Sequence, residues 1–208
     1  MSNLSLRFVL ASQSPRRKEL FSHLGIPFDI YTADLSEETR QTEPPRVVED
    51  LAEQKRQAVE AKVKFSSFAI LAADTLVFLE QEILSKPQDR QEAEKMLIRL
   101  AGRTHQVWTG VSLAFYHEKN CLYQETFSVK TEVSFDPIDD DFLNRYLDSQ
   151  ESLDKAGAYG IQGMALAFIG HIHGSYSNVV GLPLSHVKQK IDLFLQRQYL
   201  AGYKVLFS

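Results

Sequence analysis

The chain has a single cysteine, Cys121, among its 208 residues, which excludes an intramolecular disulfide. One free thiol fits a reducing compartment, and we expect Cys121 to be a small packing residue in an apolar run. The sequence also lacks an uninterrupted apolar stretch long enough to span a membrane. Its N-terminus lacks the basic and apolar regions of a signal peptide. These absences predict a cytoplasmic protein without a membrane partner.

An excess of basic residues is also missing. The chain has 23 Lys and Arg against 27 Asp and Glu, a formal net charge of −4. A dedicated nucleic-acid binder normally shows a basic excess, so we expect no nucleic-acid partner and only local anion sites. The hydrophobic content of 44% and charged content of 24% are ordinary for a globular protein. We expect residues 1–208 to form a single domain with two lobes that share one sheet.

The stretch SQSPRR at residues 12–17 lies between a short apolar run and a segment with helical spacing of apolar residues. This pattern predicts a strand, a turn and a helix, with Ser14 as N-cap and Pro15 at the first helical position. Free amides, the helix dipole, two hydroxyls and two guanidinium groups would together bind phosphate. The side chains concerned are those of Ser12, Ser14, Arg16 and Arg17. The alternative is an ordinary turn with solvated arginines.

Asp74 and Thr75 interrupt an otherwise apolar segment, residues 68–79, that is typical of a buried strand. A carboxylate there needs a partner, a metal ion or a shifted pKa, because desolvating it alone is costly. The competing interpretation is a cap at a strand end. A hairpin after this segment would carry Lys86 back toward Asp74, and Pro87 would end the returning strand.

Further elements are expected from periodicity and turn residues. Strands are predicted over 26–31, 105–115, 125–135 and 164–169, and helices over 45–63, 89–100, from 137 through 147, and at the C-terminus. The polar loop 34–45 carries Glu37 and Glu38, and the helix after it carries Lys55. His171 and His173 could bind a metal, but no third ligand is near in sequence, which disfavours that site.

The polar interruptions form a chemically coherent set. Cations and hydroxyls suit a polyphosphate, whereas carboxylates suit a divalent metal or a base that activates water. The set contains no Gly-x-Ser-x-Gly elbow and no Walker loop. The cations, hydroxyls and carboxylates of this set fit the hydrolysis of a phosphoanhydride by water. The residues are Ser12, Ser14, Arg16, Arg17, Asp74, Thr75, Lys86 and Gln162, with Glu37 and Lys55 as further candidates.

Several separated motifs resemble those of the Maf family of nucleotide pyrophosphatases, from about Leu6 to Leu195. They are residues 12–17, Leu51-Ala52 with Lys55, Ala73-Asp74-Thr75, Lys86-Pro87, Gly102-Arg103-Thr104-His105, residues 155–163, and Asn178-Val179-Val180-Gly181-Leu182-Pro183. Two positions depart from the family pattern: Ser85 stands where glycine is usual, and Arg56 where alanine is usual. Neither departure removes a reacting group.

The resemblance implies a mixed α/β fold with an elongated central sheet flanked by helices, and two lobes with a central cleft. It further implies a homodimer that hydrolyses nucleoside triphosphates to the monophosphate and pyrophosphate with Mg²⁺ or Mn²⁺. Asp74 matches the family's proton acceptor, and we expect Glu37, rather than Glu38, to bind the metal with it. Substrate-binding positions are Ser12, Ser14, Arg16, Arg17, Lys55, Thr75, Lys86 and Gln162.

Arg17, Thr75 and Gln162 match the three positions that distinguish the branch similar to dTTP/UTP pyrophosphatases from the branch acting on 7-methyl-GTP. All three have the dTTP/UTP-type residue here. A glutamine side chain offers both a donor and an acceptor to the edge of a pyrimidine. The alternative function implied by the same resemblance is a regulatory nucleotide-binding protein linked to septum formation and cell division.

Overall fold

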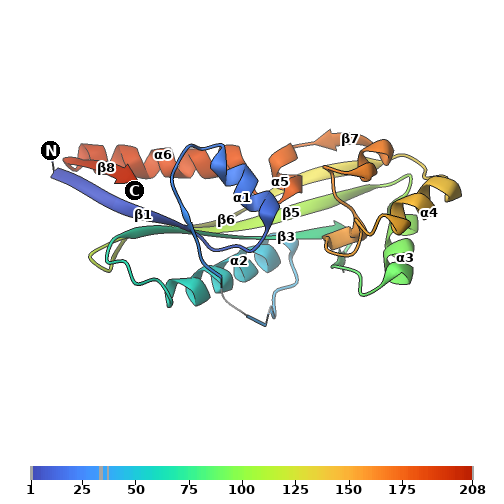
Figure 1. The fold of residues 1–208 in the computed structure, drawn as a ribbon, viewed down its shortest axis with the longest axis horizontal. Helices are drawn as coiled ribbons and strands as arrows, with labels where there is room; N and C mark the ends of the chain where they lie inside the picture. Colours follow the sequence, from blue (N-terminus) through green and yellow to red (C-terminus); the bar gives the residue numbers. More distant parts are fainter. Residues whose placement is uncertain (1, 33–34, 37, 208) are drawn as a thin grey trace. The chain divides into compact units, whose positions relative to one another are not determined.

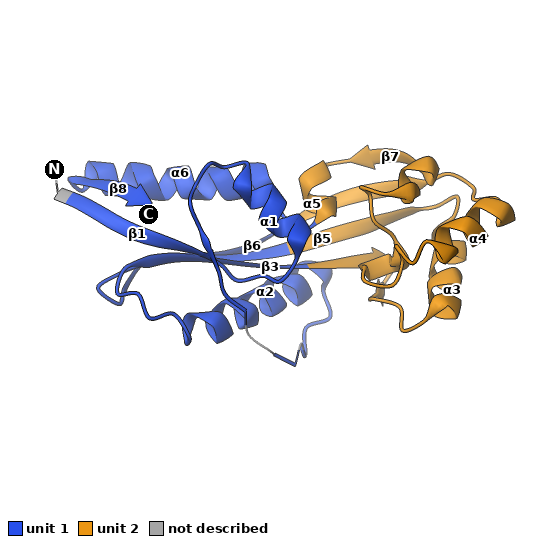
Figure 2. Ribbon diagram, viewed as in Figure 1, with its two compact units in different colours: residues 1–74, 110–128, 181–208 blue, residues 75–109, 129–180 orange. Residues whose placement is uncertain are grey.

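The computed structural model describes residues 2–32, 35–36 and 38–207. The chain divides into two compact units (Figure 2). Unit 1 comprises Met1–Asp74, Gly110–Ser128 and Gly181–Ser208, and unit 2 comprises Thr75–Thr109 and Val129–Val180. The strands β3 (Phe68–Leu79), β5 (Thr104–His117) and β6 (Asn120–Phe135) contribute residues to both units.

The strands form an eight-stranded mixed sheet in the order β2-β1-β3-β5-β6-β7, with β4 paired to β3 and β8 to β1. The shorter strands are β1 (Ser2–Leu10), β2 (Asp29–Ile30), β4 (Glu82–Leu84), β7 (Ile169–His173) and β8 (Tyr203–Phe207). Strand β1 pairs in parallel with β2, β3 and β8, whereas the β3/β4 and β6/β7 pairs are antiparallel. The predicted mixed α/β class is confirmed. The single domain with a central cleft stays a prediction.

Helices cover both faces of the sheet in unit 1 (Figure 1). Helix α2 (Pro44–Glu60) packs on one face, where Val59 joins a buried cluster with alternate residues of β3 and β5. On the other face Phe115 of β5 stacks on Phe194 of α6 (Leu184–Leu200), with ring centroids 3.8 Å apart. The ring of Phe8 in β1 packs against that of Phe21 in α1 (Pro15–Ser22), with ring centroids 4.7 Å apart. Because strand side chains alternate between faces, a residue's parity along β3 decides which helices it meets.

Gly110 of β5 lets α2 approach the sheet closely. A Cβ atom at this position would lie 2.0 Å from the backbone oxygen of Val48 in α2. No side chain fits into that space without moving the helix. The glycine therefore sets the depth at which α2, and the side chains it carries, sit on the sheet.

Unit 2 has its own core, built from one side of the sheet and the helices α3 (Arg90–Leu100) and α4 (Asp140–Asp148). Helix α3 begins after its N-cap Asp89, where a helix was predicted, and Asp89 accepts a hydrogen bond from the amide of Glu92. Helix α4 begins at Asp140, later than the predicted start at 137, and its N-cap Asp139 accepts from the amide of Phe142. Such N-caps satisfy an amide that the first helical turn leaves unpaired. Unit 2 also contains the short helix α5 (Tyr176–Val180).

The prediction of a strand over residues 164–169 is wrong. Met164–Phe168 form a 3-10 helix, and β7 begins only at Ile169. This run of Met, Ala, Leu, Ala and Phe has no β-branched residue, and the tight glycine-rich segment before it already turns the backbone. The predicted strand over 26–31 also shrinks to the two residues of β2.

Two features at the surface of unit 1 differ from expectation. Cys121 lies in β6 directly after the β5/β6 turn and is exposed, so it is not a packing residue. The C-terminal strand β8 was not predicted, because its pairing with residues 2–6 of β1 joins the two ends of the chain. No helix among the described residues is long and apolar enough to cross a membrane.

Candidate functional site

The turn before α1 is built by serine side chains, as predicted. Ser14 is the N-cap, and its hydroxyl oxygen accepts from the amide of Arg17 at 3.4 Å. The hydroxyl oxygen of Ser12, which is 8% exposed, accepts from the amide of Ser14 at 3.1 Å. Each hydroxyl accepts with its oxygen in these bonds, so its own proton is left to donate. The helix start thus combines two hydroxyl donors with the positive end of the dipole.

The two arginines of α1 differ in their surroundings. Arg17 donates from Nε to the backbone oxygen of Gly181 at 2.8 Å, which ties the first turn of α1 to the segment before α6. Both Arg16 and Arg17 are half-buried. The carbonyl contact fixes the orientation of the Arg17 guanidinium group, because Nε donates in the plane of that group. The two arginines that the sequence singled out therefore lie together at the start of α1.

Asp74 forms an ion pair with Lys55, within unit 1. Asp74 shares its parity along β3 with Ile70 and Ala72, which pack in the same cluster as Val59 of α2. Its side chain therefore projects toward α2, where Lys55 donates from Nζ to Oδ1. The exposed fractions are 7% for the Asp74 side chain and 20% for that of Lys55. The sequence left open a partner, a metal ion or a shifted pKa for this carboxylate, and the structure provides a partner, the ammonium group of Lys55.

The second oxygen of Asp74, Oδ2, is buried and has no hydrogen-bond partner among the described residues. A buried carboxylate oxygen without a donor is costly unless a cation, water or ligand completes it. The described part of the chain holds no group of three or more His, Cys, Asp or Glu side chains placed for a metal ion. Glu37, the other predicted metal ligand, lies outside the described residues. Mg²⁺ often uses only one or two carboxylates plus substrate phosphates, so Asp74 Oδ2 suits it.

Arg56, the neighbour of Lys55 in α2, is buried with a side chain that is 2% exposed. Its Nε donates to the Ser112 hydroxyl at 2.9 Å, Nη1 donates to the Tyr116 hydroxyl at 3.3 Å, and Glu60 forms an ion pair with it. Burial and the hydrogen bond with Glu60 raise the pKa of Tyr116 above its ordinary value. The sequence marked Arg56 as unusual, but its burial follows only from the packing of α2 on β5.

The other predicted substrate-binding residues belong to unit 2. Thr75 is half-buried, and its hydroxyl lies 2.9 Å from that of Thr109. Lys86 and Gln162 are exposed. The β3/β4 hairpin that leads to Lys86 is confirmed, with Val77 opposite Leu84.

The segments that carry Lys86 and Gln162 are joined to each other. The amide of Gly157 donates to the backbone oxygen of Ser85 at 3.2 Å. Gly157 has a φ of +69°, and a Cβ atom there would lie 3.0 Å from the methyl groups of Val77. Glycine is therefore required for this close approach. Unit 2 thus holds its own group of predicted residues, as unit 1 holds the serines, arginines and the Lys55–Asp74 pair.

Sequence reasoning missed Thr109, which lies in none of the quoted motifs, and gave Asn178 no role beyond its motif. Thr109 is fully buried and donates to the backbone oxygen of Asn178 at 3.0 Å. The sequence did offer one indication of Thr109, because its hydroxyl interrupts the apolar pattern of the predicted strand 105–115.

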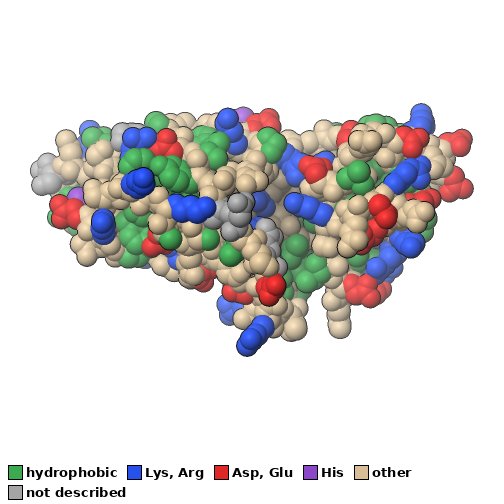
Figure 3. All heavy atoms as spheres, turned by 60° about the horizontal axis from the view of Figure 1, so that its bottom comes forward, with side chains coloured by type: hydrophobic (Ala, Val, Ile, Leu, Met, Phe, Trp, Pro, Cys, Tyr) green, Lys and Arg blue, Asp and Glu red, His purple; other side chains and the backbone are tan. Residues whose placement is uncertain are grey.

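Charge is mixed on the face shown in Figure 3, where Lys and Arg side chains lie among Asp and Glu side chains. This face shows no extended basic area of the kind that tracks a nucleic-acid backbone.

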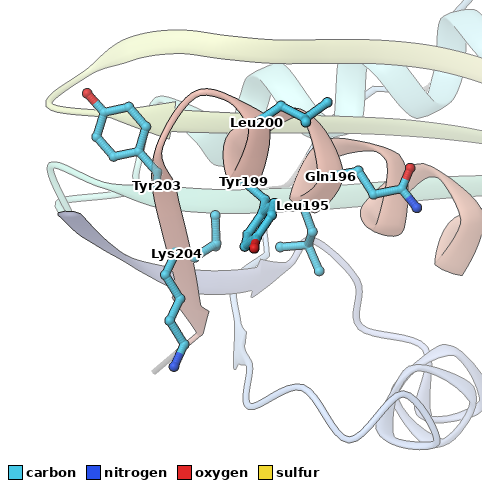
Figure 4. A pocket seen from close by; sticks show the side chains of 7 residues that line it. Leu195, Gln196, Tyr199, Leu200, Tyr203 and Lys204 are labelled. Atoms are coloured by element: carbon cyan, nitrogen blue, oxygen red, sulfur yellow. The ribbon is translucent and has the colours of Figure 1, made fainter. Parts of the chain in front are cut away.

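A hollow of about 500 Å³ lies beside the end of α6 and β8, lined mainly by apolar side chains such as Leu195, Tyr199 and Val205 (Figure 4). None of the predicted site residues lines it.

Comparison with known proteins gives consistent matches. The family model described as Maf-like protein matches residues 7–194. A dTTP/UTP pyrophosphatase of Symbiobacterium thermophilum is 44% identical over 189 residues, covering 90% of this chain and 94% of that protein. A dTTP/UTP pyrophosphatase of Bacillus velezensis is 43% identical over 192 residues, covering 92% and 98%. One from Carboxydothermus hydrogenoformans is 41% identical, covering 89% and 97%.

Proposed function

The chain belongs to the Maf-like protein family, and on this basis we propose that it is a nucleoside triphosphate pyrophosphatase that hydrolyses dTTP and UTP. The products are the nucleoside monophosphate and pyrophosphate. One observation supports this chemistry above the others: Asp74 is buried and paired through Oδ1 with Lys55, while Oδ2 has no partner among the described residues. A carboxylate held in this way is suited to take a proton from water.

In the proposed reaction a water molecule attacks the α-phosphorus, and the bond between that phosphorus and the bridging oxygen to the β-phosphate breaks. Asp74 accepts one proton from the attacking water, and the electron pair of the broken bond leaves with pyrophosphate. The ammonium group of Lys55 stabilises the charge of Asp74 and holds its carboxylate in one orientation. The low exposure of both side chains strengthens this interaction relative to a surface pair.

We propose a divalent cation, Mg²⁺ or Mn²⁺, as cofactor, with Asp74 as one ligand and Glu37 as the other. When bound, such a cation neutralises phosphate charge and lowers the pKa of a coordinated water. The support is Asp74 Oδ2, which is buried and meets no hydrogen-bond donor in the part of the chain that the structure describes.

The start of α1 is proposed to bind the triphosphate. Ser12 and Ser14 each have a hydroxyl proton to donate, and Arg16 adds positive charge at the positive end of the helix dipole. These groups complement the charge that develops on the leaving pyrophosphate. Lys55 and Lys86 are the further cations proposed to bind substrate.

Selection of the nucleobase is proposed to depend on Arg17, Thr75 and Gln162. The support is the resemblance of these three positions to the dTTP/UTP branch, together with the carbonyl contact that orients Arg17. We further propose that the protein is a homodimer and acts in the cytoplasm.

The test is pyrophosphate release measured across the common nucleoside triphosphates, with and without Mg²⁺ and Mn²⁺. We expect release from dTTP and UTP to exceed that from purine nucleotides, and to require a metal. Binding of these nucleotides without hydrolysis under every metal condition would contradict the proposal and favour a regulatory role.

A further inference from the structure

Glu151 holds both ends of the glycine-rich segment, residues 155–163, which carries Gln162. At the start of this segment, Lys155 donates from Nζ to the backbone oxygen of Glu151 at 2.6 Å. Directly after its end, Oε2 of the Glu151 carboxylate accepts from the amide of Met164 at 3.1 Å. All of these residues belong to unit 2. One residue outside the segment therefore ties its two ends together.

Glu151 is itself anchored to the end of α4. Its amide donates to the Ser149 hydroxyl oxygen at 3.3 Å, and the Ser149 hydroxyl donates to the backbone oxygen of Tyr146 at 2.7 Å. Tyr146 is fully buried in the core of unit 2. Hydrogen bonds thus lead from a core helix to Glu151, which gives its carboxylate a fixed base from which to hold the amide of Met164.

The Glu151 carboxylate also lies directly against Gly163, the residue after Gln162. A Cβ atom at Gly163 would lie 1.9 Å from Oε2 of Glu151, so no side chain fits beside the carboxylate. The φ angle of Gly163 is −115°, outside the left-handed region that favours glycine. Space, rather than backbone conformation, therefore requires glycine here, and the carboxylate is what occupies that space.

Gln162 is thus held on both sides while its own side chain is exposed. Before it, Ile161 is buried, and after it the amide of Gly163 donates to the backbone oxygen of Gly160 at 3.2 Å. A side chain on an ordered backbone has less conformational entropy to lose when it meets a ligand. Without the Glu151 carboxylate, the backbone that follows Gln162 would lose its contact with α4, and binding would have to order it.

We infer that Glu151 is a positioning residue that fixes the backbone after Gln162, so that the Gln162 amide is oriented for the nucleobase before the substrate binds. This inference rests on the proposed pyrophosphatase function, in which Gln162 helps to select the base, and deepens it. A contact with the base is the same before and during attack on the α-phosphorus, so it stabilises both states equally. Loss of the Glu151 carboxylate should therefore raise KM and leave kcat nearly unchanged.

The experiment measures kcat and KM for dTTP in two variants of Glu151. Glu151→Ala removes the carboxylate but keeps the backbone oxygen that Lys155 meets, so only the Met164 end is released. We expect KM to rise about tenfold, the effect of losing one hydrogen bond, with kcat within about twofold of wild type. Glu151→Gln keeps a side-chain oxygen that accepts from the Met164 amide, so its KM should stay within about twofold of wild type. A KM in Glu151→Gln as high as in Glu151→Ala overturns the inference.

A double-mutant cycle with Gln162→Ala tests whether Glu151 acts through Gln162. If it does, adding Glu151→Ala to Gln162→Ala leaves KM at the value that Gln162→Ala has set. Two increases in KM that multiply in the double variant overturn the inference. A purely structural role for Glu151 also predicts a different result, since kcat and the urea midpoint would fall together while KM stayed unchanged.

Gly163→Ala gives a second route to the same test that leaves Glu151 in place. Its methyl group would displace the Glu151 carboxylate, the far end of a flexible side chain, from the Met164 amide. We expect KM for dTTP to rise about tenfold in this variant. In Glu151→Ala/Gly163→Ala the collision is gone, so KM should be no higher than in Glu151→Ala alone. A wild-type KM in Gly163→Ala overturns the inference even if Glu151→Ala fails to fold.

Failure of this inference is distinguishable from failure of the proposed function. A wild-type protein that releases no pyrophosphate from dTTP refutes the proposed function. An active enzyme whose KM for dTTP is unchanged in Glu151→Ala refutes only the role of Glu151.

Discussion

Replacing Asp74 by asparagine separates catalysis from folding at the proposed proton acceptor. The substitution keeps the size of the side chain but removes its charge and its ability to take a proton. Loss of a general base typically lowers a rate by about 10²- to 10⁴-fold. We therefore expect kcat for dTTP to fall by at least about 10²-fold in Asp74→Asn.

The effect of Asp74→Asn on stability is the difference of two opposing terms. Attraction between the charges of Lys55 and Asp74 contributes about 4 kcal/mol at 4 Å and an effective dielectric constant near 20. Holding each ion away from water costs several kcal/mol, and Asp74 Oδ2 has no partner among the described residues to offset that cost. Because the terms nearly cancel, we expect the free energy of unfolding to change by less than about 2 kcal/mol.

The assay is coupled measurement of pyrophosphate release from dTTP, with urea unfolding of the same samples. Asp192→Asn is a matched control, since Asp192 pairs with Lys188 on the exposed face of α6. An exposed pair contributes at most about 1 kcal/mol, so this variant should retain both activity and stability. The assignment of Asp74 would be refuted by a kcat within about threefold of wild type. A loss of activity that only parallels unfolding would also refute it.

Four further predictions test the fold and the cofactor. Burial lowers the pKa of His105 from 6.5 to about 4, so the folded state favours the neutral ring. The free energy of unfolding is therefore highest above pH 6.5 and falls by roughly 3 kcal/mol as the pH drops toward 4, because the unfolded state binds the proton more readily. His105→Phe should flatten this pH dependence in denaturation curves. Gly110→Ala places a methyl group against the backbone of Val48 and should destabilise the protein by about 3 kcal/mol in urea unfolding, and an unchanged midpoint would contradict the packing of α2. Arg56→Met should cost about 2–4 kcal/mol by the same assay, because Glu60 loses its buried partner. Chelation with EDTA should abolish pyrophosphate release and added Mg²⁺ or Mn²⁺ should restore it; full activity in EDTA would exclude the proposed cofactor.

Much of the fold could be predicted where short-range chemistry decides the structure. Ser14 and Pro15 specify a helix start because the cap bond and the proline ring act within one turn. The apolar run 68–79 specifies a buried strand, and Asp74 within it indicates a carboxylate that needs a partner. The run 164–169 was misassigned because apolar composition alone does not separate a strand from a helix. The exposure of Cys121 could not be predicted because it depends on the place of this residue directly after the β5/β6 turn.

The sequence by itself thus determined the local elements and, through separated motifs, the family and the identity of the candidate site residues. The tertiary structure decided how those residues are paired. Lys55 meets Asp74 because α2 packs closely on the sheet at Gly110 and presents that side chain to β3. Thr109 donates to the backbone oxygen of Asn178, a residue far along the chain, because the packing of unit 2 brings the two together. Pairings of this kind depend on strand register and helix packing over long sequence separations, and local periodicity carries no information about either.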